Sequence, residues 1–134
     1  RNKIRNIVIP YIEKEFNPNI IKTMDRLSEL VTEQEEYIQK QVKDIYQKML
    51  IKENEKQMII LDLKIFNQQE KVIKSNIILY TITRLCNSAK GIEKIHVEDI
   101  IKLCNNNIGN KFLMPNKHIK VFIKNNKVTF SKED

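Results

Sequence analysis

The chain has only two glycines and three prolines in 134 residues, which limits the number of tight turns and breaks it can contain. Such a composition excludes a collagen-like protein and argues against disorder and against a loop-rich β-sandwich. A glycine-rich phosphate loop is hard to build from two glycines, and neither G-x-S-x-G nor H-E-x-x-H is present. We therefore expect no catalytic residue in this chain and no activity of the chain by itself.

Cysteine and histidine are also scarce. Cys86 and Cys104 stand far apart, no C-x-x-C motif occurs, and the two histidines are His96 and His118. This pattern excludes a disulfide framework and predicts no metal site, and it fits a reducing cytoplasm. We expect His96 to cap or precede a helix and His118 to lie in a hairpin turn.

Long apolar runs are absent as well. No run approaches 18 residues and the N-terminus has no signal-peptide pattern, so we expect no membrane association. The chain begins with Arg1 rather than Met, which suggests a piece of a longer protein.

Positive charge is plentiful. The formal net charge is +7, from 24 basic and 17 acidic residues, and this favours a polyanionic partner. Between Asn105 and Lys132 there is no acidic residue. Lys120 and Lys124 fall on the polar side of a predicted strand, where they either contact RNA phosphates or form an ordinary solvated, aggregation-blocking surface. Phe122 shares that polar side and is the candidate for base stacking, whereas Phe112 and Phe130 are expected to pack in the core.

The periodicity of apolar residues predicts an α+β fold. We expect a short helix over 2–15 disturbed by Pro10, a boundary at Asn17-Pro18, and an amphipathic helix over 18–52. A strand over 58–66, helices over 69–86 and 97–105, and three short strands after Gly109 follow. The long helix and the shorter helices would pack with a small antiparallel sheet at the C-terminal end.

The N-terminal helix carries a candidate anion clamp. Arg1 and Arg5 are four positions apart, and Asn2 and Arg5 are three apart, so all three can share one face. Two guanidinium groups beside an amide suit phosphate or carboxylate groups.

This N-terminal run, Arg-Asn-x-x-Arg followed by Ile9-Pro10 and Asn17-Pro18, resembles a segment of the tRNA(Ile)-lysidine synthetases. The likeness continues in order through most of the chain. It covers Lys90-Gly91-Ile92, Ile95 to Ile101, Gly109-Asn110-Lys111, Leu113 to Asn116, Ile119-Lys120-Val121 and Lys127 to Phe130. Two features depart from the family: its Ser-Gly-Gly-x-Asp-Ser loop is missing, and Lys117-His118 stands where many relatives have glycine.

The resemblance implies a cytoplasmic tRNA-processing ligase. Such an enzyme uses ATP (with Mg) to adenylylate the wobble cytidine of the CAU anticodon of tRNA(Ile), and lysine then displaces AMP to form lysidine. It implies that residues 1–17 end the catalytic domain and that 18–134 form the tRNA-recognition domain, with no cofactor of its own. RNA contacts would come from Arg1, Asn2, Arg5, Lys120 and Lys124.

Two alternatives remain open at the level of sequence. The 18–52 helix could serve as a protein-interaction or dimerisation module without direct RNA contact, which would make the chain a homodimer or a docking unit. The polar positions Gln34 and Gln41 in its apolar seam weaken a pure coiled-coil version. The domain could also act mainly as a spacer.

Overall fold

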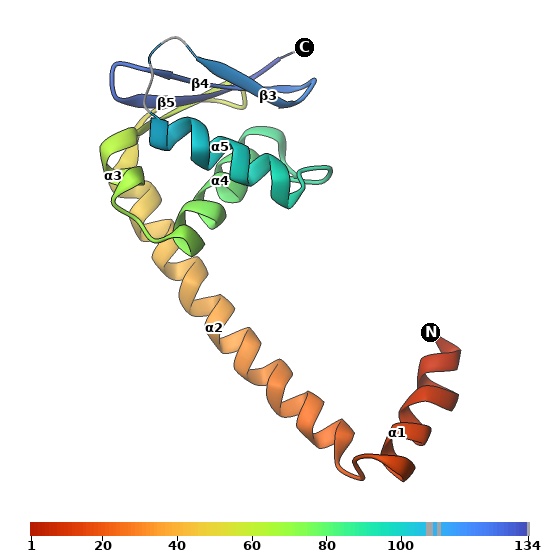
Figure 1. Ribbon diagram of the computed structural model, residues 1–134. Helices are drawn as coiled ribbons and strands as arrows, with labels where there is room; N and C mark the ends of the chain where they lie inside the picture. The colour runs from red at the N-terminus through yellow and green to blue at the C-terminus, as the bar shows by residue number, and fades with distance from the viewer. Residues whose placement is uncertain (107–108, 110, 134) are drawn as a thin grey trace. The chain divides into compact units, whose positions relative to one another are not determined.

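A computed structural model describes residues 1–106, 109 and 111–133 of the chain (Figure 1). Asn110, which belongs to one of the motifs noted above, lies outside the described residues. The chain forms two compact units, Arg1–Tyr37 and Ile38–Asp134, and each is described separately below.

The N-terminal unit begins with a helix whose geometry changes at Pro10. A π-helical turn, η1 (Ile4–Val8), leads into α1 (Ile9–Glu15), and the backbone N–H of Ile9 donates to the carbonyl of Ile4. Pro10 has no N–H and its ring crowds the carbonyl four residues earlier, so a wider turn before it relieves the conflict. The predicted disturbance at Pro10 is confirmed.

The long helix α2 (Ile20–Met49) is shorter than the sequence predicts at both ends. At its start, the Asn17 side chain accepts a hydrogen bond from the Asn19 backbone N–H, and Pro18 lies in this turn rather than in the helix. At its end, the chain leaves the helix at Leu50 and becomes a strand. Apolar residues continue through that junction, so periodicity alone does not reveal it.

A five-stranded antiparallel sheet forms the centre of the second unit. Its strands are β1 (Leu50–Asn54), β2 (Met58–Asp62), β3 (Phe112–Asn116), β4 (Ile119–Lys124) and β5 (Lys127–Lys132), in the order β1-β2-β5-β4-β3. The three predicted C-terminal strands are confirmed. The β1–β2 hairpin extends their sheet by pairing β2 with β5, and β1 was not predicted.

The predicted strand over 58–66 is wrong in its second half. It ends at Asp62, whose Oδ1 accepts a hydrogen bond from the Ile65 backbone N–H at 3.1 Å and so caps the short helix α3 (Leu63–Asn67). An aspartate followed by Leu-Lys-Ile-Phe suits a helix start as well as a strand, and tertiary packing of Leu63 and Phe66 selects the helix.

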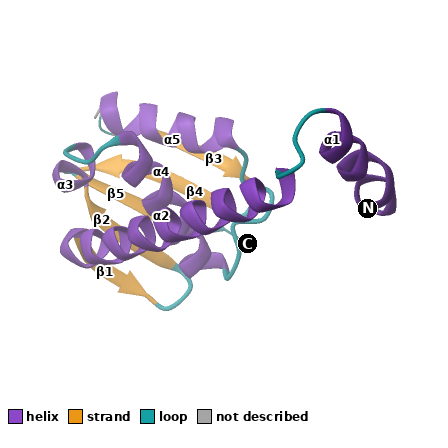
Figure 2. Cartoon of the chain, turned by 90° about the horizontal axis from the view of Figure 1, so that it is seen from below, coloured by secondary structure: helices purple, strands orange, loops and turns teal. Residues whose placement is uncertain are grey.

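Two further helices complete the unit. Helix α4 (Lys71–Cys86) ends at Asn87, which has a φ of 64° in the left-handed region that an asparagine tolerates. Helix α5 (Lys94–Asn106) begins three residues before the predicted start, so His96 lies in its first turn. The Nδ1 atom of His96 accepts a hydrogen bond from the Glu93 backbone N–H at 2.9 Å. The predicted capping role of His96 is confirmed. Figures 1 and 2 show α4 and α5 on the same face of the sheet.

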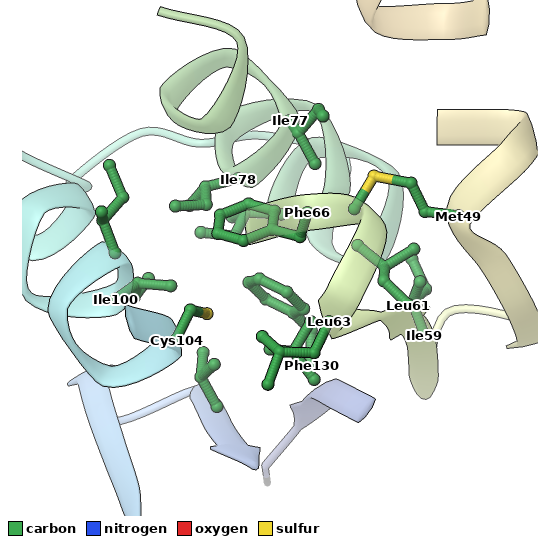
Figure 3. Packing of buried hydrophobic residues seen from close by; sticks show 14 of the residues in the cluster. Met49, Ile59, Leu61, Leu63, Phe66, Ile77, Ile78, Ile100, Cys104 and Phe130 are labelled. Atoms are coloured by element: carbon green, nitrogen blue, oxygen red, sulfur yellow. The ribbon is translucent and has the colours of Figure 1, made fainter. Parts of the chain in front are cut away.

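The core lies between that face and the helices (Figure 3). Ile59, Leu61 and Phe130 from the sheet meet Phe66 of α3 and Cys104 of α5, and all five are almost fully buried. The C-terminal part of α2 adds a buried face of its own, made of Val42, Tyr46 and Met49. The predicted α+β fold, with a long helix and shorter helices packed on an antiparallel sheet, is confirmed.

A polar cluster ties β1 to the helices. The Arg84 guanidinium donates to both carboxylate oxygens of Glu53, at 2.9 to 3.1 Å, and lies over the rings of Tyr46 and Tyr80. This hydrogen bonding raises the pKa of Arg84 above its ordinary value. Arg84 therefore has a structural role, because its charge is already paired.

Tyr46 sets an alkaline limit to stability. Burial, followed by the nearby Glu53 carboxylate, raises the pKa of Tyr46 from 10.0 to about 12. Between those two pH values the unfolded phenol ionises while the folded one stays neutral, so the free energy of unfolding falls by roughly 3 kcal/mol as the pH rises. Urea unfolding near pH 8 and near pH 12 measures this loss. Tyr46→Phe should show a smaller alkaline loss by about that amount, and an equal loss in both proteins would contradict the assignment.

Candidate nucleic-acid interface

The face of the sheet opposite the helices carries basic and aromatic side chains. Along β4, Ile119, Val121 and Ile123 are buried toward the helices, so the alternating residues Lys120, Phe122 and Lys124 face the other way. Strand pairing extends this outer face across the sheet. Phe122 lies opposite Phe112 on β3 and Thr129 on β5, and Lys124 lies opposite Lys127.

Three of these side chains form a cluster that we call the aromatic–lysine cluster: Phe112, Lys120 and Phe122. The Lys120 Nζ lies 4.5 Å from the centre of the Phe112 ring and 5.8 Å from that of Phe122. Cation–π attraction at these distances holds the ammonium group against the two rings. The cluster therefore presents a positioned charge beside two aromatic surfaces.

The expectation that Phe112 packs in the core is wrong, since 58% of its surface is exposed. Leu113, which pairs with Val121, packs against the core instead. A shift of one residue moves every side chain of a strand to the other face, and the run Phe-Leu-Met is apolar at each position. Only the pairing of Phe112 with Phe122 identifies the correct face. The interpretation of Phe130 as a core residue is confirmed, because it is 1% exposed.

A shallow hollow adjoins the cluster. Its volume is about 210 Å³, smaller than the roughly 300–1,000 Å³ typical of pockets for drug-sized ligands. The residue before β3 is also bonded to β4 at this edge, because the Lys111 carbonyl accepts a hydrogen bond from the Ile123 N–H at 3.3 Å. The hollow is lined by Lys111, Phe112, Lys120, Phe122, Ile123 and Lys124.

The lysines of this surface form no ion pairs among the described residues. Within the described part of the chain, no carboxylate forms an ion pair with Lys111, Lys120 or Lys124. The basic residues of α4 differ, because Arg84 binds Glu53 and Lys71 lies 3.9 Å from Glu98. Two of the three basic residues of α4 are therefore paired with a carboxylate, whereas Lys74 donates to the Asn105 side chain.

Curated tRNA(Ile)-lysidine synthases from several bacteria are similar in sequence to this chain. A tRNA(Ile)-lysidine synthase of Clostridium acetobutylicum is 40% identical over 116 residues, which make up 87% of this chain and 24% of the relative. The chain is a homologue of part of tRNA(Ile)-lysidine synthase. The synthase of Clostridioides difficile is 28% identical over 135 residues, covering 100% of this chain and 29% of that synthase. The synthase of Synechocystis is 30% identical over 105 residues, covering 78% of this chain and 30% of that protein.

The chain spans about a quarter of the length of these synthases. No family model matches the sequence. The resemblance inferred from sequence motifs is confirmed by the synthase relatives.

The N-terminal clamp residues that the synthase resemblance singles out lie in the other unit. Arg1, Asn2 and Arg5 are all exposed, and the Arg5 backbone N–H donates to the Arg1 carbonyl at 3.2 Å. One helical turn thus separates the two arginines, as their spacing predicts. Among the described residues neither guanidinium has an ion-pair partner. The structure places Arg1 and Arg5 one helical turn apart, and it places Lys120 and Lys124 on the same face of β4.

The described residues contain no set of three or more His, Cys, Asp or Glu side chains that could hold a metal ion. Burial raises the pKa of the Cys104 thiol to about 12, which makes it a poor nucleophile. Within residues 1–106, 109 and 111–133, no helix has both the length and the apolar content needed to cross a membrane.

Proposed function

We propose that this chain is a tRNA-recognition segment of a protein related to the tRNA(Ile)-lysidine synthases. The observation that carries the proposal is the open face of the sheet, where Lys120 lies against two aromatic rings and neither Lys120 nor Lys124 forms an ion pair among the described residues. Lysines placed in this way bind phosphate groups of RNA. Such contacts position the RNA but do not distinguish one base sequence from another.

We also propose an activity for the whole protein that contains this segment. That protein would be a cytoplasmic ligase that uses ATP with Mg and lysine to convert the wobble cytidine of the CAU anticodon to lysidine. Residues 1–17 would end its catalytic domain and 18–134 would form its recognition domain. The segment itself supplies no catalytic residue and no cofactor. Its contribution is to hold the tRNA so that the cytidine reaches an active site elsewhere.

Arg1, Asn2 and Arg5 have a separate place in the proposal. Their exposed helical turn suits a phosphate of tRNA or of the nucleotide bound by the catalytic domain. Because both arginines are free of ion pairs in the described residues, binding would not require any existing contact to break.

Salt dependence tests the phosphate contacts. We expect the affinity of the chain for tRNA to fall linearly with the logarithm of salt concentration, and each lost phosphate contact to reduce that slope by about 0.7 to 0.9. Lys120→Ala and Lys124→Ala should each reduce the slope, whereas Lys43→Ala on the exposed side of α2 should not. Fluorescence anisotropy with end-labelled tRNA gives both quantities. Absence of tRNA binding even at low salt would refute the proposal.

A second candidate function is supported by α2. Its N-terminal part exposes Met24, Leu27 and Val31, at spacings of three and four, and Leu27 is 60% exposed. An apolar helical stripe of this kind suits a partner helix, either from another protein or from a second copy of the chain. Light scattering across a range of concentrations distinguishes these cases, because a homodimer would dissociate on dilution. Leu27→Glu should prevent the homodimer from forming. A chain that binds no tRNA but dimerises would favour this second function.

A further inference from the structure

We propose that the aromatic–lysine cluster and its hollow bind one unpaired nucleotide of an RNA. The base would stack on the Phe112 and Phe122 side chains and the phosphate would lie against the lysines. This inference rests on the proposed function, and it specifies which feature of the RNA the sheet recognises.

Two aromatic side chains meet at the surface here without being needed for the core. Phe130 fills the buried side of the sheet, whereas Phe112 and Phe122 pair across β3 and β4 on the opposite side. An exposed phenylalanine leaves apolar surface in water that stacking against a base would cover. Because Phe112 and Phe122 are cross-strand partners, the sheet places both rings on one face before any ligand binds, which reduces the ordering needed on binding.

The geometry favours an unpaired nucleotide over a base pair. A base inside a duplex already has neighbours on both faces, so a protein ring can stack only on a base that has left the helix. The hollow of about 210 Å³ is large enough for a single ring system. It is also apolar where the rings line it and basic at its rim.

The basic rim is placed for the phosphate of the same nucleotide. Lys120 is held between the rings, and Lys111 and Lys124 line the same hollow. A stacked base and its phosphate are a few ångströms apart along one strand, so ring and ammonium contacts can be made together. A neutral apolar ligand would contact the rings but would not compensate the positive charges of the three lysines.

The absence of tryptophan from the chain allows a direct test of stacking. Phe112→Trp introduces the only tryptophan, and we expect its fluorescence to be quenched when a short single-stranded RNA is added. Phe16→Trp is the matched control, because Phe16 is an exposed phenylalanine of the N-terminal unit. Its fluorescence should not change under the same conditions. Equal quenching at both positions, or quenching at neither, would overturn the inference.

Affinity measurements separate stacking from general apolar contact. Phe112→Ala and Phe122→Ala should each weaken binding of the single-stranded RNA by roughly 5- to 100-fold and change binding of a duplex of the same sequence by less than about twofold. Phe112→Tyr should retain affinity. Phe112→Leu should lose it, because leucine is apolar but cannot stack on a base. If Phe112→Leu binds as well as the unmodified chain, the ring is not a stacking surface and an apolar protein side chain is the better occupant.

The inference and the proposed function fail in different ways. If Lys120→Ala weakens RNA binding but neither phenylalanine variant does, the sheet contacts phosphates alone and the nucleotide site is wrong. If the unmodified chain binds neither single-stranded RNA nor tRNA at low salt, the proposed function fails, and the nucleotide site fails with it.

Discussion

Reversing the charge of two lysines on the sheet, by Lys120→Glu together with Lys124→Glu, is expected to lower tRNA affinity on the order of 100-fold. Each lysine would lose a charge-assisted contact worth about 1.5 kcal/mol or more, and each new glutamate would repel a phosphate. Both side chains are on the outer face of β4, away from the core, so the fold should be retained. Anisotropy titration with labelled tRNA at fixed salt measures the effect.

The matched control is Lys40→Glu together with Lys43→Glu. Both lysines are exposed on α2, and this pair changes the net charge by the same amount as the first pair. A loss confined to the sheet variant supports a local contact. Equal losses in both variants would show that the total charge of the chain attracts RNA without a defined site.

The largest expected effect on stability comes from Phe130→Ala. Phe130 is 1% exposed on β5, between β2 and β4, and contacts the core on the helix side of the sheet. Truncation removes buried apolar surface and leaves a cavity, which costs about 3–5 kcal/mol of unfolding free energy. Urea unfolding followed by circular dichroism measures this cost.

Phe16→Ala is the control for the core variant. Phe16 is 74% exposed, so its truncation should change the unfolding free energy by less than about 0.5 kcal/mol. Phe112→Ala should behave in the same way, because Phe112 is on the solvent side of the sheet. A cost at Phe112 as large as that at Phe130 would contradict the strand register described above.

Much of the fold follows from local patterns in the sequence. Helix α4 ends where Asn87 can adopt a left-handed conformation, and the turn between β4 and β5 is at Asn125-Asn126, two residues that tolerate positive φ. These signals act within a few residues and were sufficient to predict helix α4 and the hairpin of β4 and β5. Lys120 and Lys124 were likewise placed on the correct face by the simple alternation of β4.

The features that could not be predicted depend on contacts distant in sequence. Strand β1 forms because β2 provides a partner, and its own side chains are mostly exposed. Phe112 reaches the surface because Leu113 pairs with Val121, and this register is set between two strands rather than within one. The sequence therefore predicted only part of the aromatic–lysine cluster: it placed Phe122 and Lys120 on the outer face but not Phe112.

One consequence of this arrangement is that stability and binding can be altered independently. Along β4 the odd-numbered residues stabilise the core, while the even-numbered residues form the candidate interface. Substitutions at Lys120, Phe122 and Lys124 should then affect RNA affinity with little change in the free energy of unfolding. The same strand offers both the test residues and, at Val121, a purely structural comparison.

Mapping the contact by nuclear magnetic resonance tests most directly whether RNA binds the outer face of the sheet. Titrating the isotopically labelled chain with unlabelled tRNA should shift backbone amide signals over 111–124, including Phe112, Lys120 and Phe122, and leave the exposed face of α2 unchanged. Shifts confined to residues 20–37 of α2, or no shifts at all, would contradict RNA binding at the sheet.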